Sequence, residues 1–329
     1  TTNGFSHSSW RPFKVGEILT LEYGRALQSY REGVGASEVF GTNGKIGVTD
    51  ISIYDKPSVV IGRKGAYRGV HLAKNPFFVI DTAFYTKPKH IEIDVDFTYY
   101  WFKCIDINSM DSGSAIPSTS RDEVYELDIL LPEENEQKAI AFVLSRLDDK
   151  IDLLHRQNQT LEAMAETLFR QWFVEQAELS WEPCNVGDVF SIKGGTTPST
   201  AEPSYWGGNV PWTSPRDLSN HRSIFLFDTN KKITELGLSQ IGSGLLPTGA
   251  VLLSSRAPIG YLAITDLPVA INQGYIAMIC DDGIPNYYAY LWCKSNMDII
   301  KGAGNGSTFE EISKSSFKSL QFQVPPTSK

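Results

Sequence analysis

One long heptad pattern constrains the fold of this chain more than any other sequence feature. Neither Pro nor Gly occurs between Glu136 and Phe173, and apolar residues recur there at alternating steps of four and three. The pattern positions are Ile140, Leu144, Leu147, Ile151, Leu154, Asn158, Leu161, Ala165, Leu168 and Trp172. This spacing is the a/d pattern of a coiled coil. Because a helix rises about 1.5 Å per residue, Ile140 and Trp172 would lie roughly 50 Å apart.

The sequence therefore predicts one continuous helix whose apolar seam packs against a second helix. The polar Asn158 would fix the register or orientation of that pairing at some cost in stability. The alternative is a single amphipathic helix that packs this face on its own domain.

Length and composition favour a multidomain intracellular protein. A chain of 329 residues predicts two domains or more. It contains no run of about 18 apolar residues, so we expect no membrane span, and its first ten residues lack the apolar region of a signal peptide. Cys104, Cys184, Cys280 and Cys293 are far apart and form no CxxC motif. This predicts reduced thiols, a cytoplasmic location and no zinc site.

The net charge of −8 argues at first against a nucleic-acid partner. Its distribution along the chain changes that inference. Residues 133–180 carry a net charge of −5, whereas residues 1–132 carry −2 and residues 181–329 carry −1. The negative charge is thus concentrated in the predicted helix, and the flanking segments are free to present basic faces.

The segments on either side of the helix repeat each other. Four pairs of matching stretches occur in the same order, at offsets of 171 to 193 residues: Trp10–Ile18 with Trp181–Val189, Val59–Leu72 with Val251–Ile264, Phe78–Tyr85 with Val269–Ile276, and Ser112–Pro132 with Asn305–Pro325. The pattern indicates a tandem duplication of about 180 residues. It also predicts a second long helix after the second copy.

Each copy predicts an α+β domain. Short runs rich in Val, Ile, Tyr and Phe alternate with Gly and Pro, as in strands joined by turns. One helical segment is expected in each copy, around Thr98–Ile107 and Tyr287–Lys301. We therefore predict two homologous α+β domains joined by a long coiled-coil helix. The expected boundaries are 1–132 for the first domain, 133–179 for the helix, 180–326 for the second domain and 327–329 for the start of another helical region.

No motif supports a catalytic centre. Asn75-Pro76-Phe77-Phe78 lacks the second Pro of the amino-methyltransferase loop and is better explained as a turn between strands. The Gly41–Lys45 segment lacks the spacing of a phosphate-binding P-loop. Glu136 and Lys138 match part of a nuclease motif, but they lie at a predicted helix start instead of on a strand. The five histidines are scattered. We predict no catalytic residue and no metal ligand.

Basic residues in predicted turns are the candidate functional residues. Arg63, Lys64 and Arg68 lie in one stretch that contains no acidic residue, and Lys45 follows a Gly-containing turn. Such side chains bind phosphates, and arginine also reads guanine in the major groove. The alternative for each is an ordinary solvated surface charge. The candidate DNA contacts are Lys45, Arg63, Lys64, Arg68, Arg216, Lys231, Lys232 and Arg256, with Arg222 nearby.

Motifs spread over nearly the whole chain are similar to those of one protein family. They are Leu131-Pro132 with Glu136-Gln137 at the helix start, Leu168–Phe173 at its end, Gly195–Pro198, Tyr205–Gly208, Pro211-Trp212 and Ser255–Gly260. Together with the duplicated plan, they resemble the DNA-specificity (S) subunits of Type I restriction–modification systems.

This resemblance implies a non-catalytic subunit with two target-recognition domains, each reading one half of a bipartite site in double-stranded DNA. The spacer helix would dock methyltransferase (M) subunits, through seam residues Ile140, Leu144, Leu147, Ile151, Leu154, Leu161, Leu168 and Trp172. Restriction (R) subunits would complete an ATP-dependent endonuclease. S-adenosylmethionine, ATP and Mg²⁺ would bind to these partners, and no cofactor to this chain.

Family members typically carry a second conserved helix after the second domain, and here only Thr-Ser-Lys follows Pro326. A second copy of the chain, in a homodimer, is one source of a partner helix. Two other functions remain open. One is a scaffold or decoy that binds methyltransferase subunits without reading DNA, and the other is a stand-alone nuclease or methyltransferase.

Overall fold

A computed structural model describes residues 10–30, 34–89, 93–110, 116–177, 181, 183–219, 221, 223–256, 258–280, 283–305 and 310–324. Arg222, residues 327–329 and part of the last repeat match lie outside these ranges. The chain divides into two compact units, Thr1–Gln157 and Asn158–Lys329, which are described separately below.

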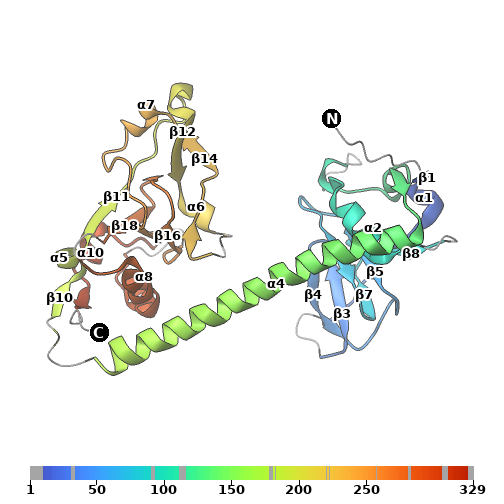
Figure 1. Ribbon diagram of the computed structural model, residues 1–329, viewed down its shortest axis with the longest axis horizontal. Coiled ribbons are helices and arrows are strands. Elements are labelled where there is room, and N and C mark those ends of the chain that lie inside the picture. The colour runs from blue at the N-terminus through green and yellow to red at the C-terminus, as the bar shows by residue number, and fades with distance from the viewer. Residues whose placement is uncertain are drawn as a thin grey trace. The chain divides into compact units, whose positions relative to one another are not determined.

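The first unit is built from short strands and three short α-helices, together with the first part of a long helix (Figure 1). Its elements are β1 (Arg11–Lys14), α1 (Val15–Ile18), β2 (Leu19–Tyr23), β3 (Ser37–Gly41), β4 (Gly44–Thr49), β5 (Ser58–Gly62), β6 (Val70–Ala73), β7 (Phe77–Val79), β8 (Ala83–Pro88), α2 (Val95–Lys103), the 3₁₀ turn Ile107–Ser109, α3 (Arg121–Tyr125) and β9 (Asp128–Leu131). The strands form a β2-β8-β5-β6 sheet, a β4-β3-β7 sheet and a β1-β9 pair.

Strand β5 shows why this sequence folds as it does. Its five residues, Ser58–Gly62, are all buried. Because alternate residues of a strand point to opposite faces, Val59 and Ile61 enter the core cluster that holds Phe102 of α2, and Val60 enters the cluster of Phe77. Helix α2 packs on β5 and β6. A strand covered on both faces needs a continuous apolar run, and the sequence supplies one.

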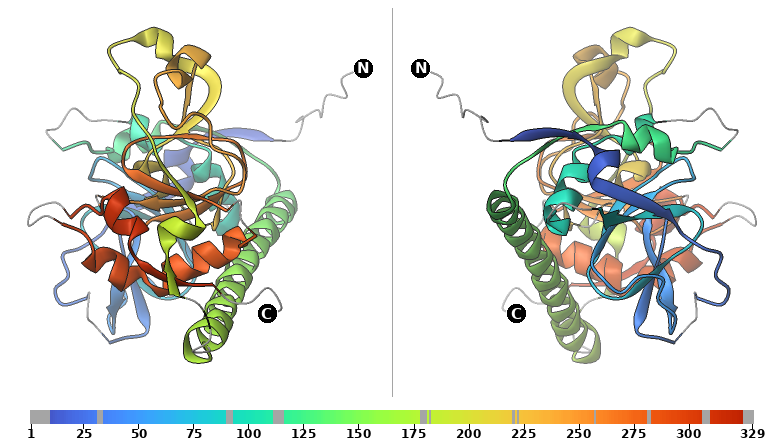
Figure 2. Two further views of the ribbon diagram at one scale, coloured as in Figure 1. Left: turned by 90° about the vertical axis from the view of Figure 1, so that its left-hand side faces the viewer. Right: turned by 90° about the vertical axis from the view of Figure 1, so that its right-hand side faces the viewer.

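The second unit repeats this plan with additional elements. They are β10 (Pro183–Asn185), α5 (Val186–Val189), β11 (Ser191–Gly194), the 3₁₀ turn Pro203–Tyr205, β12 (Trp206–Thr213), α6 (Pro215–Leu218), β13 (Phe225–Leu226), β14 (Lys231–Ile233), α7 (Glu235–Leu238), β15 (Val251–Ser254), β16 (Leu262–Thr265), β17 (Ala270–Ile271), β18 (Tyr275–Ile279), α8 (Asn286–Ser295), α9 (Met297–Gly302), α10 (Lys314–Lys318) and β19 (Gln321–Gln323). Its sheets are β11-β18-β15-β16-β13, β14-β12-β17 and β10-β19. Strand β12 and helix α7 lie at one end of this unit, and the β10-β19 pair lies at the other (Figures 1 and 2).

The strand registers confirm the predicted duplication. In the first unit Val59 pairs with Leu72, and in the second Val251 pairs with Ile264, as the repeat predicts. Strands β3 and β7 pair in parallel, and so do their counterparts β12 and β17. The match of Phe78–Tyr85 needs a one-residue correction, because the registers make Ile276 equivalent to Phe84 instead of Tyr85. The two predicted helical segments are present as α2 and as α8 with α9.

The predicted long helix is confirmed. Helix α4 (Glu134–Arg170) runs for 37 residues and continues into a π-helical turn, Gln171–Glu175. Gln137 and Ala141 are buried against the first unit, and Phe169 is buried in the second. The amide of Gln137 fixes the helix start, since its nitrogen donates to Pro132 O and its oxygen accepts from Asp94 N.

Most of the heptad seam is open on α4. Leu147, Ile151, Leu154, Leu161, Leu168 and Trp172 are 40 to 62% exposed, and only Ile140 and Leu144, near the helix start, are half-buried. Ile140 packs on the first unit, but the seam residues from Leu147 to Trp172 are not covered by the described parts of either unit, which disfavours the single amphipathic helix considered above. The pairing of this seam with a second helix stays a prediction. Among the described helices, none is both long enough and apolar enough to cross a bilayer.

Candidate nucleic-acid interface

The turn between β5 and β6 presents two of the predicted contacts. The backbone N–H of Arg63 donates to Thr82 O at 2.8 Å, which fixes where the side chain leaves the sheet. Its guanidinium carbon lies 4.9 Å from the ring centroid of Tyr23 and 5.8 Å from that of Phe84. Lys64 is exposed, and its backbone bridges to Ser118. The two residues are thus presented at the surface of the first unit.

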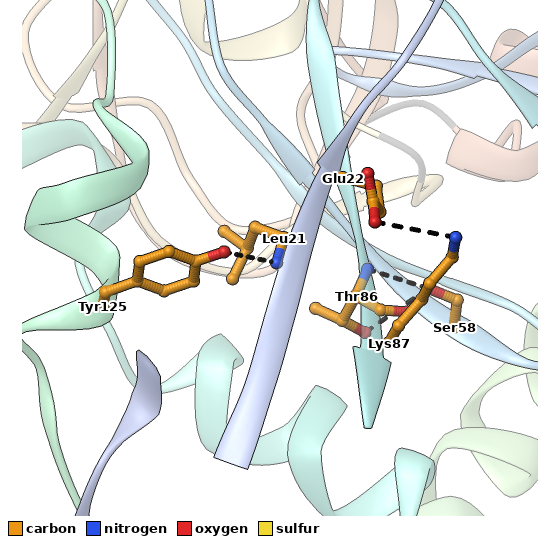
Figure 3. Close-up of polar contacts among 6 residues, drawn as sticks. All are labelled: Leu21, Glu22, Ser58, Thr86, Lys87 and Tyr125. Atoms are coloured by element: carbon orange, nitrogen blue, oxygen red, sulfur yellow. Dashed lines mark hydrogen bonds and ion pairs between the residues drawn. The ribbon is translucent and has the colours of Figure 1, made fainter. Parts of the chain in front are cut away.

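Two residues that the sequence analysis did not single out, Tyr23 and Arg121, lie close to Arg63. Tyr23 ends β2, and Arg121 begins α3, with its guanidinium carbon 5.0 Å from the same Tyr23 ring centroid. Helix α3 is held against β2 because the Tyr125 hydroxyl accepts a hydrogen bond from Leu21 N at 2.9 Å (Figure 3). The Ser120 side chain caps the helix by accepting from Glu123 N. No local sequence pattern links Tyr23 to Arg121, because they are distant in the chain.

The prediction of a DNA contact from Arg68 is wrong for the chain as folded here. Its side chain is only 3% exposed. Its Nη2 donates to Asn108 O at 2.9 Å and to Met110 O at 2.7 Å, and its backbone N–H donates to Asn108 Oδ1. A buried guanidinium bound to backbone carbonyls is a structural tie between the β5–β6 turn and the segment after α2.

Lys45 lies on the surface, but it is paired. Its Nζ is 2.9 Å from Glu38 Oε1, and the side chain is 52% exposed. An exposed ion pair contributes about 0 to 1 kcal/mol, so a phosphate would compete easily for this lysine. A contact between Lys45 and DNA stays a prediction.

In the second unit, two predicted lysines line a surface hollow of about 460 Å³ together with Trp206 and Asn230. Lys231 Nζ lies 5.4 Å from the Trp206 ring centroid. Lys232 Nζ lies 3.5 Å from Asp228 Oδ1. A hydrogen bond from Thr229 N, followed by the charge of Lys232, lowers the pKa of Asp228. The Trp206 ring is half-buried, and basic groups beside an accessible aromatic ring are typical of nucleic-acid-binding surfaces.

The structure also brings Arg216 and Arg256 to one cleft of about 360 Å³, which includes Tyr261 and Asn272. Arg216 lies on α6, and Arg256 follows β15. The Nη1 atom of Arg256 is 3.6 Å from Glu311 Oε2, so this guanidinium has an acidic neighbour. The sequence did not predict that these two arginines would share a cleft.

Equivalent backbone frames in the two units carry different side chains. Arg63 N donates to Thr82 O and Thr119 N donates to Arg63 O; in the second unit Ser255 N donates to Gly274 O and Ile312 N donates to Ser255 O. Arg63 therefore corresponds to Ser255. The same comparison matches Lys64 with Arg256, through the bridges that they form with Ser118 and Glu311. The backbone frame is shared, and the side chains that it carries differ.

No reaction centre emerges from the residues that the structure describes. They contain no group of three His, Cys, Asp or Glu side chains placed to hold a metal ion. Burial raises the pKa values of Tyr275 and Cys293, and it raises the pKa of Tyr288 to about 12. All three belong to hydrophobic clusters, so burial in the core explains these shifts without a catalytic role.

Known proteins resemble this chain over most of its length. The family described as Type I restriction modification DNA specificity domain matches residues 7–163 and 178–329. The MjaIX specificity subunit of Methanocaldococcus jannaschii is 35% identical over 162 residues, which cover 49% of this chain and 38% of that protein. The HindI specificity subunit of Haemophilus influenzae is 23% identical over 303 residues, covering 69% of this chain and 65% of that protein. This chain thus spans less than two thirds of the length of either relative.

A solved structure has the same fold. The S subunit of a Type-I restriction-modification system from M. genitalium matches with a TM-score of 0.60 and 19% identity, over 98% of this chain and 86% of that one. Two separate family matches also agree with the duplication seen in the strand registers. This chain belongs to the family of Type I restriction modification DNA specificity domains and carries two copies of the domain.

Proposed function

We propose that this chain is the sequence-specific DNA-binding subunit of a Type I restriction–modification complex. Each unit contacts one half of a bipartite site in double-stranded DNA. The single observation that carries this proposal is the shared backbone frame with different side chains at equivalent positions, such as Arg63 in one unit and Ser255 in the other. Two readers of one fold that recognise different half-sites need this combination of a constant frame and variable contacts.

The contacts proposed for the first unit are Lys45, Arg63 and Lys64. Those for the second unit are Arg216, Lys231, Lys232 and Arg256. All of these side chains lie at the surface or in open clefts, and several neighbour aromatic rings. Lysine and arginine at such places contact phosphates, and arginine also reads base edges.

In this proposal α4 docks the methyltransferase subunits, and restriction subunits join the assembly. The open heptad seam supports such docking, because apolar side chains on a long helix are stable in water only when another surface covers them. The chain itself does no chemistry. S-adenosylmethionine, ATP and Mg²⁺ bind to its partners.

The test is selection of DNA by the chain assembled with its methyltransferase subunits. A library of randomised duplexes is incubated with the complex, and the bound DNA is sequenced. We expect enrichment of two short motifs separated by an unread gap. Replacing Arg63 and Lys64 by Ala should weaken the preference for one motif and leave the other unchanged.

The same selection tests the alternative function. If the methyltransferase subunits bind and no motif is enriched, the chain is a scaffold or decoy and the DNA-reading proposal is wrong. A variant with Leu147, Ile151 and Leu154 replaced by Ser provides the control for docking. It should lose the methyltransferase subunits without unfolding either unit, because these seam residues are exposed.

A further inference from the structure

We propose that Tyr23, Arg63 and Arg121 form a binding pocket for a single DNA backbone phosphate. This inference rests on the proposed DNA-binding function, and it names the ligand of one cavity in the first unit. The cavity measures about 180 Å³ and is lined by Tyr23, Arg63, Arg121, Asp122 and the segment Ser118–Ser120. All of these residues belong to the first unit.

Both guanidinium groups lie against one aromatic ring. Their carbon atoms are 4.9 Å and 5.0 Å from the Tyr23 ring centroid. A guanidinium that packs on a ring keeps its N–H groups in its own plane, so they remain available for an anion. Two cations at one ring also repel each other, and a bound anion relieves that repulsion.

The two arginines of this pocket make few hydrogen bonds within the described residues. Within the described parts of the chain, the buried Nε of Arg121 makes no hydrogen bond. The hydrogen bond that the structure gives to the Arg63 side chain is a long one, from Nη1 to Asp81 O at 3.3 Å. Buried N–H groups normally have partners. An oxyanion in the cavity would supply acceptors for the terminal N–H groups of both arginines, in the geometry that makes arginine a good phosphate ligand.

The charge of the pocket fits a phosphodiester. Two arginines and Asp122 give the lining side chains a net charge of +1. A backbone phosphodiester carries one negative charge, whereas a terminal phosphate or a nucleotide carries more. The cavity also adjoins a proposed DNA contact, because the backbone of Lys64 bridges to Ser118.

The second unit lacks this arrangement. The strand registers place Gly194 where the first unit has Tyr23, and Ser255 replaces Arg63. Lys314 follows the capping residue Ser313 as Arg121 follows Ser120. A lysine beside a glycine and a serine has neither the ring nor either guanidinium, so we expect this phosphate contact in the first half-site only.

The experiment uses the chain with its methyltransferase subunits, bound to the DNA site found by selection. Each phosphate of that site is replaced in turn by an uncharged methylphosphonate. With the wild-type chain, one linkage in the first half-site should weaken binding about tenfold, since a hydrogen bond to a charged group is lost. With Arg121→Gln or Arg63→Gln, the same replacement should cause no further loss, while the other linkages keep their effects.

Matched variants separate this pocket from general charge effects. Arg11, an exposed arginine 5.8 Å from the Phe13 ring centroid, serves as the control. Arg11→Gln should keep the full wild-type linkage pattern. Asp122→Asn removes the acidic lining residue and should strengthen binding at the same linkage.

The outcomes distinguish the two proposals. If the wild-type complex selects a bipartite site and the Arg121→Gln complex shows an unchanged linkage pattern, the pocket proposal is overturned and the DNA-binding function stands. If the wild-type complex selects no site, both fail. Retained effects of the other linkages in the first half-site show that the first unit, which holds Arg121, is folded in the Arg121→Gln chain, so a loss confined to one linkage cannot come from unfolding.

Discussion

The two units share a backbone and differ in where they place positive charge. In the first unit the charge gathers around Tyr23, through Arg63 and Arg121. In the second unit the corresponding residues are Gly194, Ser255 and Lys314, and the charge lies in two other clefts, near Trp206 and around Arg216. Strand pairing fixes the frame through backbone hydrogen bonds, which do not depend on side chains. The side chains on that frame are therefore free to differ.

The largest expected effect tests the frame itself. Ile61 and Leu253 occupy equivalent strand positions and are both fully buried. Replacing either by Ala should destabilise its own unit by about 2–5 kcal/mol, through lost burial and the cavity left behind. Hydrogen exchange of the full chain, followed by peptide, measures each unit. Loss of protection in both units from either single substitution would contradict their independence.

The next effect distinguishes a structural arginine, Arg68, from Lys64, a lysine of the same turn that we propose to contact DNA. Arg68→Ala removes two hydrogen bonds to backbone carbonyls and should lower the stability of the first unit by about 1.5–3 kcal/mol. Lys64→Ala, on the exposed side of the same turn, should change stability by less than about 0.5 kcal/mol.

DNA binding should show the reverse order. Lys64→Ala should reduce the slope of log affinity against log salt concentration by about 1, the change expected when one phosphate contact is lost. Arg68→Ala should leave that slope unchanged in the folded fraction. Titrations at several salt concentrations, combined with thermal unfolding, measure both quantities. A changed slope for Arg68→Ala would return this residue to the interface.

A smaller effect comes from one acidic residue of the second unit, Glu311, whose counterpart in the first unit is Ser118. Glu311 lies 3.6 Å from Arg256, and Ser118 occupies the corresponding place beside Lys64. Glu311→Ser should strengthen binding of the second half-site, and Ser118→Glu should weaken binding of the first. Each change should be at most about fivefold, because exposed ion pairs are weak. Equal effects on both half-sites would show that the units do not read DNA separately.

The features predicted correctly from sequence depend on local patterns. The heptad spacing predicted α4, and the repeated stretches predicted the common frame. Helix α2 begins at Val95, three residues before the expected Thr98, because Asp94 caps it by accepting from Phe97 N. A capping residue is difficult to distinguish from a turn residue without the helix that it caps.

The site was harder to predict because it depends on contacts between distant segments. A run of basic residues does not reveal which of them points inward, and Arg68 was misassigned for this reason. Arg121 and Tyr23 meet because α3 packs beside β2, where Leu21 N donates a hydrogen bond to the Tyr125 hydroxyl. The sequence contains these residues, but the pairing of the segments that bring them together is a property of the fold.

The smallest expected effect is a pH dependence confined to the first unit. His71 on β6 pairs with Val60, and the equivalent residue of the second unit is Ala263, which pairs with Leu252. Burial, followed by the charge of Lys103, lowers the pKa of His71, and only a backbone hydrogen bond at Thr42 opposes this. A histidine with a lowered folded-state pKa takes up its proton on unfolding. The stability of the first unit should therefore fall as the pH drops below about 6.5.

Hydrogen exchange corrected for intrinsic rates should show loss of protection in β6 but not in β16, and His71→Gln should abolish the difference. An equal loss in β16 would assign the effect to the whole chain instead of this one imidazole.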